Sequence, residues 1–336
     1  MHVENHTPFL GAQIVVLDKE GAEQLILALK ATYDLADGRG LEIAKDQQPL
    51  RLVDQFQGEP GISSIRYAAE LGPPNLTTDI ALVGSAVATR PDVTSIDVGL
   101  RVASITKWAR VFGDRQWKKG LLGFTLSSPL PIERVPLTYE NAFGGQDKSA
   151  KSQKHHAREP RNPVGRGFKA KKSSLDFAGK PAPNIEDPQK LLHHPGDAVE
   201  PQGFGFIGRD WEPRVQYCGT YDEKWLAERI PLLPLDFNDR FYHAAHPDLI
   251  APAPLKGGES VEVVGCSPSG RLFFSLPVLR PAVKVSGSAL AESAEMKMDT
   301  LLIDTDAMKL SLIFKAAVKI HRRLMNVRLI EFRLGT

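Results

Sequence analysis

Cysteine is scarce in this chain. Cys218 and Cys266 are the only two among 336 residues, and they are not arranged as CxxC. Two cysteines by themselves cannot complete a four-ligand zinc site. They could form one disulfide, but we expect two buried free thiols, because thiols stay reduced in most intracellular compartments.

Long apolar runs and a charge imbalance are absent too. No stretch approaches the roughly 18 uninterrupted apolar residues of a membrane span. The first eleven residues, MHVENHTPFLG, contain neither the basic nor the apolar part of a secretory signal. Lysine and arginine number 42 against 40 acidic residues, a net charge of +2 that gives no case for a nucleic-acid binder. We therefore expect a cytoplasmic protein with no membrane partner.

The sequence also lacks the common motifs of catalysis and cofactor binding. Neither GxSxG nor HExxH occurs. The histidine pairs 155–156 and 193–194 have no third ligand at a recognised zinc spacing, so we expect solvated histidines and no metal. Residues 203–208, GFGFIG, have the glycine spacing of a dinucleotide fingerprint. No apolar strand precedes them and no helix can follow through Pro213, so a turn is expected, and no cofactor.

Glycine and proline, in contrast, are abundant. The 28 glycines and 25 prolines make up about 16% of the chain, against a usual level of roughly 12%. Such a chain turns often. We expect a mainly β fold, with antiparallel sheets in a sandwich-like arrangement, long ordered coil and few short helices.

Several segments carry strand patterns. Residues 12–17 and 24–33 are apolar and alternate, although 24–33 could pass for a helix on propensity alone. Residues 94–112 read as a half-buried strand with every second side chain on one face. Residues 258–277 and 299–320 read as hairpins. One short helix is expected near residues 222–229, within a long ordered coil over residues 181–247.

The domain organisation is expected to be a single β-rich unit over residues 1–336, with two lobes as the alternative. The lobes are an N-terminal β lobe (1–147) and a C-terminal lobe rich in coil and hairpins (173–336). Between them, residues 148–172 contain nine lysines and arginines against one acid, Glu159. We expect this segment to be a mobile loop, because it can bury too little apolar surface to offset the entropy lost on ordering. A nucleic-acid contact is the alternative, though no aromatics are interleaved to stack on bases.

Residues 129–145, PLPIERVPLTYENAFGG, are the densest motif. Three prolines forbid a continuous helix, and the glycine pair lets the chain reverse sharply after Phe143. Tyr139 and Glu140 on so constrained a chain are either a site or a structural lock. We expect a lock, in which Glu140 caps backbone amides or pairs with an arginine and Phe143 is buried.

The carboxylates of Glu140, Asp222 and Asp236 supply the groups that a hydrolase-type enzyme needs for acid–base work. An equally physical use is pairing with Arg214 and Arg240, which lie near the last two in the chain. With no nucleophile motif beside them, we favour a protein that is not an enzyme.

Ten short motifs in a fixed order resemble one known family. They are Asn5-x-Thr7-Pro8-Phe9, Thr78-Asp79, Gly113-Asp114-Arg115-x-Trp117, Pro136-Leu137-x-Tyr139-Glu140-x-Ala142-Phe143-Gly144-Gly145, Asn162-Pro163-x-Gly165-x-Gly167, Pro183-Asn184-x-Glu186, Gly203-Phe204-Gly205, Trp211-x-Pro213-Arg214, Gly219-Thr220-Tyr221-Asp222-x-x-Trp225 and Leu235-Asp236-Phe237-x-x-Arg240-Phe241. From about residue 5 to residue 305, the chain resembles the bacterial family named domain of unknown function 2169.

The resemblance implies an accessory role in type VI secretion, because members are encoded beside VgrG and PAAR spike proteins and their toxic effectors. The expected function is that of an effector chaperone or adaptor that helps to load a toxin onto the spike. Its expected partners are a type VI effector, a PAAR-repeat protein and VgrG. The family supplies no catalytic residues. The motif positions, structural or partner-binding, are Tyr139, Glu140, Phe143, Gly144, Gly145, Trp211, Arg214, Tyr221, Asp222, Trp225, Asp236 and Arg240.

Overall fold

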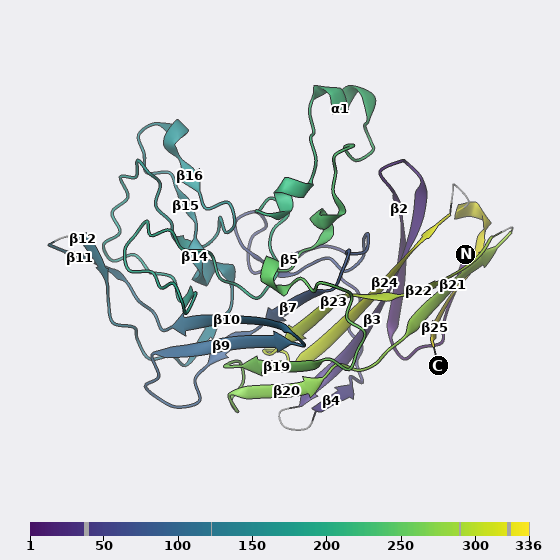
Figure 1. Ribbon diagram of the computed structural model, residues 1–336, viewed down its shortest axis with the longest axis horizontal. Coiled ribbons are helices and arrows are strands. Elements are labelled where there is room, and N and C mark those ends of the chain that lie inside the picture. Colours follow the sequence, from purple (N-terminus) through teal and green to yellow (C-terminus); the bar gives the residue numbers. More distant parts are fainter. Residues whose placement is uncertain (37–39, 122, 289, 321–323, 336) are drawn as a thin grey trace.

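A six-stranded sheet forms the centre of the computed structural model, which describes residues 1–36, 40–121, 123–288, 290–320 and 324–335 (Figure 1). Its strand order is β2-β3-β24-β23-β7, and β4 pairs with the end of β3. The strands are β2 (Leu10–Leu17), β3 (Glu23–Ala36), β24 (Lys309–Lys319), β23 (Lys297–Asp304), β7 (Asp79–Val83) and β4 (Gly40–Ile43).

Alternation along β3 explains why the segment at 24–33 is a strand and not a helix. Leu25, Leu27 and Leu29 point into the main core, whereas Ile26 and Lys30 lie on the opposite face of the sheet. All five are fully buried, so this sheet is covered on both faces. The hairpin expected at 299–320 is also present, as the antiparallel pair β23–β24.

Two further sheets pack around the first. The four-stranded sheet β1-β25-β21-β22 lies over β24, and the five-stranded sheet β18-β10-β9-β19-β20 lies beside β4 and β8. Their strands are β1 (His2–Asn5), β25 (Val327–Leu334), β21 (Pro281–Gly287), β22 (Leu290–Glu295), β18 (Ile185–Glu186), β10 (Ile105–Phe112), β9 (Ser95–Val102), β19 (Ser260–Val264) and β20 (Arg271–Ser275).

Residues 94–112 differ from the single strand expected there. They form the hairpin β9–β10, which reverses after Val102 with Ala103 at a φ of 52°. Because no glycine or proline marks that turn, the alternating pattern concealed it. The expected apolar face is nevertheless present, since Val98 and Leu100 are buried. The hairpin expected at 258–277 is β19–β20.

One hydrophobic core joins all three sheets. Leu27 of β3, Leu100 of β9 and Phe332 of β25 belong to the same buried cluster. The sandwich-like, mainly antiparallel β fold expected from composition is therefore confirmed. Strands from either side of residues 148–172 also share sheets, since β3 pairs with β24, β7 with β23 and β9 with β19.

Coil and short elements cover the rest of the body. The two-stranded pairs are β5 (Gln55–Phe56) with β6 (Ile65–Tyr67), β8 (Ser85–Val87) with β13 (Arg134–Pro136), β11 (Trp117–Gly120) with β12 (Gly123–Leu126), β14 (Phe143–Gly144) with β17 (Arg166–Gly167), and β15 (Gln146–Asp147) with β16 (Ala157–Arg158). The helical elements are α1 (Glu223–Glu228), η1 (Tyr139–Asn141), η2 (Gln153–His155), η3 (Arg214–Tyr217), η4 (Asp239–Tyr242), η5 (Pro247–Leu249) and η6 (Leu324–Asn326).

The basic segment 148–172 is attached to the body at several points. Its strands β16 and β17 pair with β15 and β14, and Asn162 is fully buried. Asp147 accepts hydrogen bonds from the Ala170 amide at 3.0 Å and the Ser149 hydroxyl at 2.6 Å. Burial works against ionisation of this carboxyl, but these hydrogen bonds outweigh it and lower the pKa of Asp147 to about 2. This is a tighter arrangement than the loop expected from composition.

The thiols and the helices complete the account. Cys218 is half-buried and Cys266 buried, both are free, and burial raises the pKa of the Cys266 thiol to about 12. Within the described ranges, the helices are all too short or too polar to cross a bilayer.

Candidate functional site

Tyr139 is the centre of a buried structural unit, which we call the frame: residues 139–145 with Ser64, Asn162 and Gly203. Its ring stands edge-on to Trp211 at a centroid distance of 5.4 Å. Its hydroxyl donates to the carbonyl of Gly205 at 3.3 Å. Complete burial raises the pKa of Tyr139 far above its ordinary value, so this phenol stays neutral and serves in packing.

Glu140 caps a neighbouring segment, as expected for a lock. One carboxylate oxygen accepts from the Ser64 amide at 2.6 Å and the other from the Ser64 hydroxyl at 2.8 Å. These contacts join η1 to the β5–β6 hairpin across 76 residues of sequence. The backbone carbonyl of Glu140 accepts from Arg166 at 2.8 Å, so the arginine binds the main chain and not the carboxylate.

The glycine pair after Phe143 allows a close approach of the segment 162–165, because a side chain at Gly144 would overlap Asn162 and one at Gly145 would overlap the Gly165 carbonyl. Gly144 and Gly145 have φ values of 152° and 102°, which other residues rarely adopt. The Asn162 side-chain amide donates to the carbonyls of Tyr139 at 2.8 Å and Phe143 at 2.9 Å. Phe143 is buried, as expected, and belongs to a small core with Trp117 and Phe177. The motif therefore holds backbone together.

Residues 219–236 form a projection that we call the arm. Figure 1 shows α1 at the end of two coil segments that rise from the body. At its base, Asp236 accepts from the amide and hydroxyl of Thr220 at 3.0 and 2.7 Å. Gly219, at a φ of 79°, lets the two segments approach there, because a side chain would press on Asp236 and Phe237. The base is thus closed by motif residues.

The outer half of the arm is organised around Trp225. Asp222 is the N-cap of α1 and accepts from the Trp225 amide at 2.8 Å. The Trp225 indole donates to the Leu232 carbonyl at 2.9 Å, and its ring stands against Tyr221 at 4.7 Å. The short helix predicted at 222–229 is confirmed. Its motif residues hold the arm in shape.

The surface of the arm is unusually apolar for so small a projection. Four large apolar side chains of the arm are more than half exposed: Tyr221 (52%), Leu226 (59%), Ile230 (55%) and Leu235 (72%). Arg229 donates to the Lys19 carbonyl at 2.6 Å, so the arm touches the turn between β2 and β3. Exposed apolar side chains gathered in one place are characteristic of binding surfaces.

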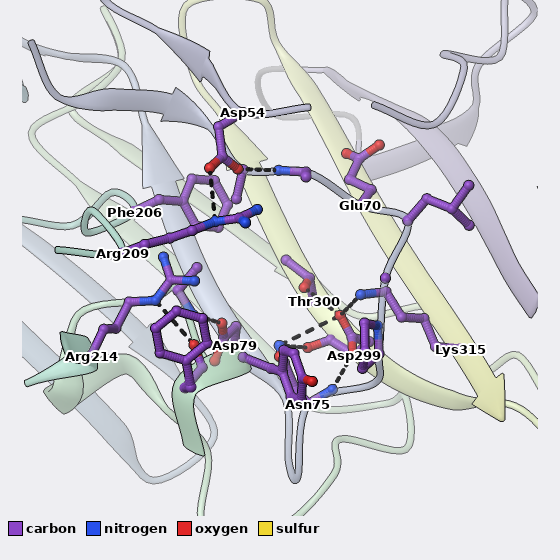
Figure 2. A pocket seen from close by; sticks show the side chains of 18 of the residues that line it. Asp54, Glu70, Asn75, Asp79, Phe206, Arg209, Arg214, Asp299, Thr300 and Lys315 are labelled. Carbon is purple, nitrogen blue, oxygen red and sulfur yellow. Dashed lines mark hydrogen bonds and ion pairs between the residues drawn. The ribbon is translucent and has the colours of Figure 1, made fainter. Parts of the chain in front are cut away.

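A cavity of about 300 Å³, which we call the sheet pocket, lies between the outer face of the six-stranded sheet and the coil that leads to the arm (Figure 2). Most of its charged wall residues form ion pairs. Asp54 meets Arg209 at 3.4 Å and Asp299 meets Lys315 at 3.1 Å. Glu70 is bound by the buried Lys30 at 2.8 Å. Apolar lining comes from Ile14, Val16, Ala68, Ala69, Leu71, Phe206, Phe241, Ala244 and Leu302.

Arg214 forms one wall of this pocket and hydrogen-bonds to backbone carbonyls rather than to a carboxylate. It donates to the carbonyls of Ile207 at 2.8 Å and Phe241 at 3.2 Å. Burial, together with the nearby Arg209, lowers the pKa of Arg214 to about 10, so it remains charged at neutral pH. Arg240 lies 5.9 Å from the Tyr217 ring. For Arg214, the arginine–carboxylate pairing considered from the sequence is replaced by contacts to the two carbonyls and to the Phe241 ring, whose centroid is 5.5 Å away.

The three carboxylates considered for hydrolysis occupy separate places. Glu140 holds Ser64 in the frame, Asp222 caps α1, and Asp236 closes the base of the arm. Each one binds a backbone amide of its own surroundings.

The sequence placed Asp79 in a motif of the family resemblance but assigned it no role. Asp79, at the start of β7, is buried and meets His243 Nδ1 at 2.6 Å. It also accepts from the amides of Ala244 and Ala245 at 2.6 and 3.1 Å. Asp79 thereby fixes the coil that forms one side of the sheet pocket. A charged residue opening an otherwise apolar strand was the available signal.

One group of potential metal ligands occurs within the described residues. Glu4, His6 and Glu331 place one ligand atom each within 4.8 Å of one another. Glu331 also forms an ion pair with Arg333 and lies 4.0 Å from Lys284. Those cations occupy the carboxylate, so the group fits a surface ion network better than a cation site.

Comparison with known proteins places the chain in a family. The family model described as "Uncharacterized protein conserved in bacteria (DUF2169)" matches residues 20–315. The chain belongs to this family. The matched range contains the whole frame and arm, but it begins after β2. No curated protein and no solved structure matches the chain.

Proposed function

We propose that this protein is a non-enzymatic adaptor or chaperone of type VI secretion, which binds an effector in the cytoplasm and aids its loading onto the PAAR/VgrG spike. Membership of a family conserved in bacteria is consistent with this role. The link to secretion comes from the resemblance described under the sequence analysis. The arm is the observation that carries the binding function.

The energetics of the arm favour binding over any internal role. The hydrogen bonds of Asp222, Trp225 and Asp236 stabilise the arm, yet its apolar side chains remain exposed to water. Burying one such side chain contributes about 1.5–3 kcal/mol. A partner that covers Leu226, Ile230 or Leu235 gains that free energy, so the arm is a preformed anchor for another protein.

The test is co-purification with the products of neighbouring genes: the effector, the PAAR-repeat protein and VgrG. The tagged protein is expected to capture at least one of them. Leu226→Asp and Ile230→Asp are expected to weaken capture by at least about tenfold each, because tenfold in affinity is about 1.4 kcal/mol. The matched control is Val278→Asp, a 62% exposed valine outside the arm, which should capture normally.

Two outcomes contradict the proposal. One is that no neighbouring gene product is recovered from the native host. The other is capture that both arm variants leave unchanged, with melting temperatures equal to that of the parent protein.

A further inference from the structure

Strand β2 is an unprotected edge of the central sheet. It is eight residues long, LGAQIVVL, and pairs with β3 along its whole length on one side. It ends the strand order of its sheet, so its other side has no strand neighbour in the described part of the chain. Leu10, Ile14 and Leu17 are 38–48% exposed. Long, apolar edge strands readily pair with another chain.

The other edges of the three large sheets are protected in ways that β2 is not. Strands β1, β4, β18, β20 and β22 are each shorter and each carries a charged residue. The far edge of the six-stranded sheet, β7, is covered: its Leu82 amide donates to Phe204, and Asp79 bridges to Ile250. Strand β2 has neither charge, proline nor cover along residues 10–17.

The hydrogen-bond pattern identifies the free groups on this edge. The Asp18 amide donates to Ala22, which closes the β2–β3 turn. Antiparallel ladders alternate, so residues 10, 12, 14 and 16 exchange hydrogen bonds with β3. Gly11, Gln13, Val15 and Leu17 therefore direct their N–H and C=O groups outward. Those groups have the spacing that an extended strand needs.

The side chains of β2 connect this edge to the sheet pocket. Ile14 and Val16 point to the pocket face and line the cavity. The nearby charges of Asp54, Asp299 and Glu70 are neutralised by their own partners. A strand added to β2 would direct every second side chain toward that cavity, and walls of this polarity suit an apolar side chain.

We propose that β2 receives an extended segment of the client as an added strand, with alternate apolar side chains entering the sheet pocket. This inference rests on the proposed function and names how the client is held. The arm touches the β2–β3 turn through Arg229, so one client can contact both surfaces.

A second copy of this chain is the competing occupant. Symmetric pairing of two β2 strands would satisfy the outward backbone groups equally well. It would leave unused the mostly apolar cavity beside the strand, which can accept side chains from a partner that continues across it. The client segment is therefore favoured.

Hydrogen exchange of the co-expressed complex provides the first test. The probe is the neighbouring-gene product that co-purifies with this protein, compared with the free protein at the same concentration. The backbone amides of residues 11–17 that face outward are expected to exchange at least about tenfold more slowly in the complex, as ladder amides do.

Paired variants provide the second test. Ile14→Lys places a charge on the edge beside the pocket and is expected to weaken capture by about tenfold or more. Ala291→Lys makes the same kind of change at an exposed position of β22, an edge strand of the four-stranded sheet, and should leave capture unchanged. Melting temperatures of both variants, measured alongside, separate lost binding from lost folding.

The outcomes separate this inference from the proposed function. Capture that depends on the arm, with β2 amides exchanging as in the free protein, overturns strand addition and leaves the adaptor standing. Slow exchange of β2 that grows with protein concentration and needs no client assigns the edge to a second copy and also overturns it. Failure to capture any neighbouring product removes both.

Discussion

The frame and the arm are built from the same kinds of residues and end in opposite environments. Each contains an aromatic, an acid that binds a backbone amide, and a glycine that permits close approach. In the frame the aromatic side chain of Tyr139 is 3% exposed, whereas in the arm Tyr221 is 52% exposed. Identical local chemistry therefore stabilises the interior in one case and displays a surface in the other.

That contrast separates two kinds of motif residue. Substitutions in the frame should reduce the free energy of unfolding of the whole protein, because the frame joins segments far apart in sequence. Substitutions in the arm should change binding with little effect on global stability, because the arm projects from the body and, among the described residues, is attached to it at its base and at the Lys19 carbonyl.

The largest effect is expected from Gly144→Ala. Its φ of 152° disfavours any side chain, and the added methyl group would overlap the carbonyl of Asn162. We expect destabilisation of about 3 kcal/mol or more, measured by denaturant unfolding. Gly205→Ala is the control, since the space around Gly205 is open. Equal stability of the two variants would show that the frame can accommodate a side chain at position 144, contrary to this prediction.

Glu140→Ala should have a smaller global effect. It leaves the buried amide of Ser64 without its acceptor, which costs about 1–3 kcal/mol. Solubility and client binding are expected to fall together. Glu140→Gln keeps an oxygen for the amide and should restore most of the stability. A variant that stays fully stable and binding-competent but loses a measurable reaction would instead make Glu140 catalytic.

The smallest effect on stability is expected from Asp222→Ala in the arm. Loss of the N-cap costs about 0.5–2 kcal/mol, but only locally in α1. The melting temperature should hardly move, while amides of residues 223–229 exchange faster and capture weakens. Glu223→Ala, on the same helix without a capping bond, is the control. A large drop in melting temperature would contradict this prediction and show that the arm and the frame unfold as one structural unit.

The parts predictable from the sequence are those with local signals. Alternation at 24–33 and turn residues at 268–270 located β3 and the β19–β20 hairpin, and Asp222 marked the start of α1. The β9–β10 turn had no such signal. Composition also gave no hint that Asn162 and Asp147 attach the basic segment to the body, because each acts through a few specific hydrogen bonds that composition does not reveal.

The sheet pocket could not be predicted for a different physical reason. Its walls come from pairs separated along the chain, such as Lys30 with Glu70 and Asn75 with Asp299. Neither partner stands out locally, and only the fold brings them together. Asp79 and His243 are likewise brought together only by the fold, since 164 residues separate them in the sequence.

The interleaving of the two ends of the chain has a consequence for the order of folding events. Strand β3 pairs with β24, and β1 lies parallel to β25, so β1 and β3 wait for strands synthesised about 300 residues later. Pairings this distant in sequence form slowly. During synthesis the apolar strands of residues 10–36 are exposed until residues 297–334 emerge from the ribosome. We therefore expect folding to be mainly post-translational, with the central sheet completed only after its distant strands have been synthesised.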